Sequence, residues 1–194
     1  MDYKSRITNR AVQIDITGIG NFNTVKEAAM MANDVLRDEE FYKQIALHPF
    51  FDRCNTTPAT IARLMRESAF TMTVDLYYAL SPVKNIDGYD DPENPFVIHM
   101  NVWKIDRSPE SMCNTIIHAC VHAVNAYFEE YEFGHGDHSL NGKENTAPYW
   151  IGALAQRMNS IEDPIIIPLE HDVCGPDMYN TSKKFAEEML AIAR

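Results

Sequence analysis

The sequence has few cysteines and no long apolar run, and each shortage excludes a class of protein. Its four cysteines contain no C-x-x-C pair and are too sparse in 194 residues for a disulfide framework. No stretch approaches the roughly 18 apolar residues that a membrane span needs. The N-terminal residues also lack the apolar core of a signal peptide. We therefore expect a cytoplasmic protein without a membrane partner, although secretion as an effector is compatible with the same features.

Basic residues are also in short supply. Lysine and arginine number 17 against 28 aspartates and glutamates, which gives a formal net charge of −11. Nucleic-acid binding depends on basic surface that neutralises phosphates, and an anionic membrane repels an acidic protein. The charge balance therefore predicts that nucleic acid is not a partner.

The hydrophobic pattern predicts an α+β fold. Alternating or β-branched segments indicate strands, and apolar residues three and four apart indicate helices. We expect one domain over 1–194, in which 1–68 contribute an N-terminal strand and helices. Residues 70–194 would form the core, a small, mostly antiparallel sheet packed on a helix. The expected strands are 11–17, 70–78 and 96–103, the expected helices are 24–46, 59–67, 109–131, 148–158 and 182–193, and loops are expected at 81–95 and 132–147.

Two histidines four residues apart, His118 and His122, lie in an otherwise apolar segment of the expected helix 109–131. Residues at this spacing share one face of a helix, about one turn apart, so both imidazoles can bind a single metal ion. The spacing alone is a weak signal, because histidines four apart also arise by chance. The residues that follow the helix give it weight.

The segment 133–139 reads Phe-Gly-His-Gly-Asp-His-Ser and offers three further ligand candidates, His135, Asp137 and His138. Catalytic zinc usually has three protein ligands and one open position. We favour His135, because it comes first after the helix and has glycine on both sides. We expect Gly134 and Gly136 to let the backbone turn tightly enough to return His135 to the helix.

This arrangement resembles the zincin metallopeptidases, in which a helix with the pattern H-E-x-x-H follows a strand that lines the substrate cleft. The resemblance covers roughly residues 96–152 and implies zinc-dependent hydrolysis of a peptide bond in a protein or peptide substrate. The substrate would lie along the strand 96–103 as an added strand. The pattern requires a glutamate after the first histidine as general base, and here that position is Ala119.

Three other residues have expected roles beside the Zn²⁺ ligands. Asp137 is a candidate to orient a ligand imidazole, or to act as an alternative ligand. His138 is a candidate to polarise a substrate carbonyl. Tyr149, in the passage Asn145-Thr-Ala-Pro-Tyr-Trp150, is a candidate to stabilise an oxyanion.

The alanine at position 119 leaves several interpretations open. The chain is either an inactivated Glu-to-Ala variant of a metallopeptidase or a natural pseudoprotease. In the second case it would be a catalytically silent module that binds metal or a partner. A closed site with four protein ligands would indicate structural zinc. Two histidines and Asp137 would also suit non-haem iron, but the expected strands are too few for the barrel typical of such oxygenases.

Overall fold

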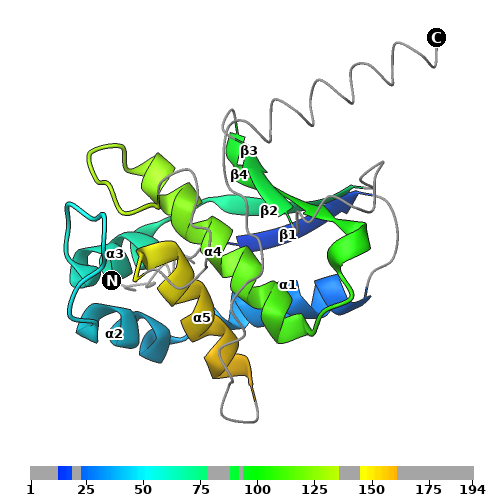
Figure 1. The fold of residues 1–194 in the computed structure, drawn as a ribbon, viewed down its shortest axis with the longest axis horizontal. Coiled ribbons are helices and arrows are strands. Elements are labelled where there is room, and N and C mark those ends of the chain that lie inside the picture. The colour runs from blue at the N-terminus through cyan, green and yellow to red at the C-terminus, as the bar shows by residue number, and fades with distance from the viewer. Residues whose placement is uncertain (1–12, 19–22, 78–87, 92–93, 136–144, 161–194) are drawn as a thin grey trace, which may run out of the picture.

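The computed structural model describes residues 13–18, 23–77, 88–91, 94–135 and 145–160. These residues form both helices and strands, which confirms the α+β class (Figure 1). The expected helix 182–193 lies outside them. The strands are β1 (Gln13–Gly18), β2 (Thr71–Tyr77), β3 (Gly88–Asp91) and β4 (Asn94–Asn101); the helices are α1 (Asn23–Val35), α2 (Glu39–Leu47), α3 (Pro58–Glu67), the short 3-10 helix η1 (Val102–Lys104), α4 (Pro109–Tyr127) and α5 (Ala147–Asn159).

The four described strands form one sheet in the order β1-β2-β4-β3. The β1–β2 and β2–β4 pairs are parallel, and only β3 runs antiparallel to its neighbour β4. The expectation of a mostly antiparallel sheet is therefore wrong. Parallel neighbours need a crossover connection, and the chain from α1 to α3 supplies one between β1 and β2.

The position of β4 also corrects the expected substrate path. This strand pairs with β2 on one side and β3 on the other. Its backbone groups are thus used within the sheet, and a peptide cannot add to it as a further strand over the paired residues. The strand β3 was itself missed, because it falls in the segment 81–95 that we expected to be a loop.

Two helices differ from the expected boundaries. The expected helix 24–46 is divided into α1 and α2, because Asp38 caps the second helix by accepting a hydrogen bond from the backbone N–H of Glu40 at 2.9 Å. The helix expected to reach position 131 ends at Tyr127. The other described helices begin at expected signals, with Thr57 before α3 and Ser108 before α4 as N-caps whose side chains accept backbone N–H bonds.

Helix α4 lies at the centre of the molecule. It contacts the sheet, α1, α3 and α5, and in Figure 1 the helices gather on one side of the sheet. Most of its 19 residues are buried, including polar ones. Side chains of β2 that point toward the helices are buried in the same apolar cluster, whereas the alternate ones remain partly exposed. No described helix is both long and apolar enough to cross a membrane.

Helix α5 approaches α4 closely at Gly152. A Cβ at this position would lie 2.9 Å from the backbone oxygen of Asn114 and 3.3 Å from the Cβ of His118, and it would collide with the Asn114 side-chain oxygen. Helix propensity alone would make alanine favourable by about 1 kcal/mol. We expect the steric conflict to outweigh this gain in helix propensity. Gly152→Ala should therefore lower the free energy of unfolding by about 1–3 kcal/mol, measured by chemical denaturation.

Gly134→Ala is the matched control for this measurement. An added Cβ at Gly134 would meet no atom closer than 3.5 Å, so its stability should stay within about 0.5 kcal/mol of the unchanged protein. Equal stabilities for the two variants would contradict the close α4–α5 approach.

Candidate metal centre

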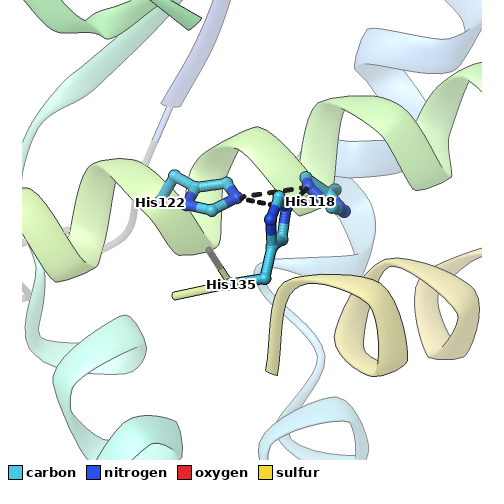
Figure 2. Close-up of side chains that lie close together, drawn as sticks. All are labelled: His118, His122 and His135. Carbon is cyan, nitrogen blue, oxygen red and sulfur yellow. Dashed lines mark hydrogen bonds between the residues drawn. The ribbon is translucent and has the colours of Figure 1, made fainter. Parts of the chain in front are cut away.

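Three histidine side chains converge beside α4 (Figure 2). His118 and His122 project from one face of the helix, and His135 reaches them from the segment that follows it. The Nε2 atom of His135 lies 3.0 Å from the Nε2 atoms of His118 and His122, which are themselves 3.2 Å apart. The structure thus brings together the three side chains that the sequence predicts as metal ligands, and this cluster could hold a metal ion.

The triangle of nitrogens cannot be satisfied by hydrogen bonds alone. A neutral imidazole has one N–H and one lone pair. Whichever of the three Nε2 atoms carry protons, at least one of the three contacts sets two donors or two acceptors against each other. A single cation removes the conflict, because it accepts all three lone pairs at once. The geometry therefore points to a metal rather than to a histidine hydrogen-bond network.

The distances fit a transition metal. Zn–N bonds are about 2.0–2.1 Å long, which places two ligand nitrogens of a tetrahedral ion about 3.3 Å apart. The observed separations of 3.0–3.2 Å come within a few tenths of an ångström of this value. Imidazole donors suit zinc, copper, iron and nickel, so the ligand set alone leaves the identity of the metal open.

Burial keeps the two helix histidines neutral. His118 is only 2% exposed, and its pKa lies well below the usual value. The main cause is that burial penalises the charged form; positive charge on His122 or His135 would lower the pKa further. Burial, and then the charge on His135, lower the pKa of His122 to about 3. Neutral imidazole is the form that binds metals, so both side chains are in the binding form near pH 7.

The second ring nitrogen of His118 also fits a ligand role. With Nε2 facing a cation, Nδ1 carries the proton and needs an acceptor. Nδ1 is buried and has no hydrogen-bond partner among the described residues. Asn114 lies four residues earlier on the same face of α4. Its side-chain Oδ1 is buried and accepts no hydrogen bond, although its amide N–H donates to Gln156 at 2.8 Å. The two atoms are a chemically complementary donor and acceptor, but they form no hydrogen bond with each other.

Asn125 fixes the segment that carries the third histidine, and no sequence motif identifies this residue. Its side-chain amide donates to the backbone oxygen of Tyr131 at 2.7 Å, and its side-chain oxygen accepts from the backbone N–H of Phe133 at 2.9 Å. Phe133 is fully buried. One side chain on α4 therefore turns the chain back after the helix and places His135 beside His122.

The loop between α2 and α3 holds the same segment from outside. Asn55 donates its backbone N–H to the backbone oxygen of Glu132 at 2.9 Å and accepts the N–H of Glu132 on its side chain at 2.8 Å. Asn145 is bound to this loop as well, accepting from the N–H of Asp52 at 2.7 Å and donating to the oxygen of Phe50 at 2.9 Å. The chain before and after positions 136–144 is thus tied to one loop.

These contacts correct the expected role of glycine. The backbone at Gly134 is not in the left-handed region, and an added Cβ would make only ordinary contacts. The turn that returns His135 therefore does not require glycine at position 134, because the Asn125 hydrogen bonds hold it. Gly136 lies outside the described residues.

The remaining predicted site residues have different outcomes. Tyr149 is buried and forms part of the site wall: its ring stacks on His135, with centroids 4.8 Å apart, and lies edge-on to His118 at 4.6 Å. Its proposed action on an oxyanion remains a prediction. Ala119 is 1% exposed and belongs to the apolar core. Asp137 and His138 lie outside the described residues.

Comparisons with known proteins leave the centre to be interpreted from its own geometry. No family model, no curated protein and no solved structure matches the chain. The likeness to zincins therefore depends on the residues described above, and peptidase function is a proposal.

Asn125 should control metal affinity. Removing its side chain frees the His135 segment, and loss of a group that positions a ligand typically weakens metal binding about 10- to 100-fold. We expect that loss for Asn125→Ala, measured by zinc competition against a chromophoric chelator. Asn33→Ala is the control, because Asn33 bonds the Ala29 carbonyl on α1, away from the histidines. Equal zinc affinities for the two variants would show that Asn125 does not position His135.

The metal-free protein should lose stability in acid through the histidines of this cluster. The pKa of an unfolded histidine is about 6.5, whereas the pKa of folded His122 is about 3. The unfolded state thus binds more protons below pH 6.5, and stability falls as the pH drops from there toward 3, by about 1.4 kcal/mol per pH unit for this group. Denaturation in chelator should show a shallower decline for His122→Gln. The same slope for both proteins would contradict a neutral His122 in the folded protein.

Proposed function

We propose that this chain is a zinc-binding protein of the metallopeptidase type, with His118, His122 and His135 as the ligands and a peptide or protein as the molecule it acts on. The observation that carries the proposal is the convergence of three Nε2 atoms within 3.2 Å of one another. When bound, zinc supplies Lewis acidity that polarises a carbonyl group and acidifies water.

The residues of the chain would provide ligand geometry and an open position. Three protein donors on a tetrahedral ion leave the fourth position for a substrate or water, as in catalytic zinc sites. A cavity of about 530 Å³, lined in part by His122 and His135, adjoins the ligands. The ring of Tyr149 stacks on His135, which limits how His135 can rotate. This combination favours a site that receives a ligand over one that only holds structural metal.

The general base of the zincin pattern has no counterpart, because position 119 is alanine. A missing general base typically lowers the rate about 10²- to 10⁴-fold. We expect the chain as given to bind zinc and peptide ligands but to hydrolyse peptides slowly or not at all.

A catalytically silent module that binds metal or a partner is the second candidate. It is favoured by the environment of Ala119, which is packed in the apolar core and does not line the cavity. A glutamate there requires neighbouring side chains to move. The two candidates differ in whether restoring the carboxylate restores hydrolysis.

Ala119→Glu separates them. We would load the unchanged chain and the variant with zinc, measure the zinc content, and assay cleavage of a broad library of quenched fluorescent peptides. The metallopeptidase proposal predicts about one zinc per chain in both proteins and cleavage at least 100-fold faster in the variant. Zinc in both proteins without cleavage in either would favour the silent module.

Ala119→Gln is the matched control, because glutamine has the same size and burial but cannot accept a proton as a base. Cleavage by the glutamate variant alone assigns the gain to the carboxylate. Absence of zinc from the unchanged chain, with His122→Gln as the reference for background binding, would reject the metal site itself.

A further inference from the structure

An arginine shares the cavity with two of the three histidines. Arg53, from the loop between α2 and α3, lines the same space of about 530 Å³ as His122, His135 and Glu132. Among the described residues that line this cavity, Arg53 alone carries a permanent positive charge. The whole chain is strongly acidic, so this charge stands out beside the proposed zinc site.

The backbone of Arg53 is held in an unfavourable conformation. Its φ angle is 51°, the only positive value among the described residues other than glycine. A side chain in the left-handed region costs free energy that glycine would not incur. The hydrogen bonds of Asp52 and Asn55 to Asn145 and Glu132 fix the chain on both sides of this residue. A strained residue that its surroundings hold in place is a reason to look for a function in its side chain.

The guanidinium has no protein partner within the described part of the chain. The other described arginines that form ion pairs, Arg37, Arg63 and Arg66, each contact a carboxylate within 3.4 Å. Arg53 forms no such pair, not even with Glu132 across the shared cavity. Its side chain is exposed. It is therefore available to a ligand that enters the cavity.

We propose that Arg53 is a specificity residue that binds a carboxylate of the peptide ligand while zinc binds in the adjoining histidine site. A planar guanidinium matches a carboxylate in a two-point hydrogen-bonded pair. The carboxylate is either an acidic side chain or the C-terminus of the peptide, and both present the same group to Arg53. This inference rests on the proposed zinc site and names the substrate class that the site prefers.

The test uses short peptide hydroxamates, whose hydroxamate group binds zinc. One pair differs only in glutamate or glutamine as the side chain; a second pair differs only in a C-terminal carboxylate or amide. Calorimetry on the zinc-loaded chain should show about tenfold tighter binding of the acidic member of at least one pair, the amount expected for one charged hydrogen-bonded contact. The pair that shows it identifies the source of the carboxylate.

Two variants assign the preference to Arg53. Arg53→Gln should abolish it while zinc content and binding of the neutral hydroxamates stay unchanged. Arg63→Gln is the matched control, because it removes the same charge from an exposed pair with Glu67 on α3 and should leave the preference intact. Arg53→Gly should also lose the preference but melt at a higher temperature, because glycine relieves the positive φ.

The outcomes separate the inference from the function on which it rests. Equal affinities of the unchanged chain for acidic and neutral hydroxamates overturn the role of Arg53 and leave the zinc site standing. An equal loss of preference in Arg53→Gln and Arg63→Gln also overturns it, because the effect would then come from net charge. If the unchanged chain binds neither zinc nor any hydroxamate, both the inference and the proposed function fail.

Discussion

The burial of α4 between the sheet and α5 is the packing interaction on which the site depends. A helix that is apolar on most faces needs neighbours on most faces, and α4 has them in α1, α5 and the sheet. Its polar residues are consequently enclosed as well: Asn114 and His118 are each no more than 3% exposed. Gly152 permits the close approach that encloses them. The ring of His118 is therefore held by the packing of the core.

This enclosure explains why the centre could hold a cation. A buried polar group is costly unless it has a partner, and hydrogen bonds cannot satisfy three facing imidazole nitrogens simultaneously. The same enclosure lowers the pKa of His118 and of His122, which removes competition from protons. Burial thus favours metal binding in two ways. It leaves imidazole lone pairs without hydrogen-bond partners, and it keeps these nitrogens unprotonated.

The sequence predicted the three converging histidines better than it predicted the residues and strands that position them. His118 and His122 could be paired because the four-residue spacing on a helix is a local property, and His135 followed from its position after that helix. Asn125 could not be identified, because its two hydrogen bonds depend on where α4 ends. The direction of the strands depends on the crossover from β1 to β2. The strand β3, Gly-Tyr-Asp-Asp, has no alternation of apolar and polar residues that would predict a strand. It forms because it pairs with β4.

The short separation of the ligands along the chain has a consequence for folding. His118 and His135 are 17 residues apart, with His122 between them, whereas the sheet that supports α4 joins strands far apart in the sequence. Closing so short a loop costs little entropy, so the same three histidines could bring their lone pairs to a metal ion in the unfolded chain as well. Binding to the unfolded state reduces the stabilisation that a ligand provides. If a metal occupies this centre, the rise in melting temperature on adding it would therefore understate its affinity for the folded protein.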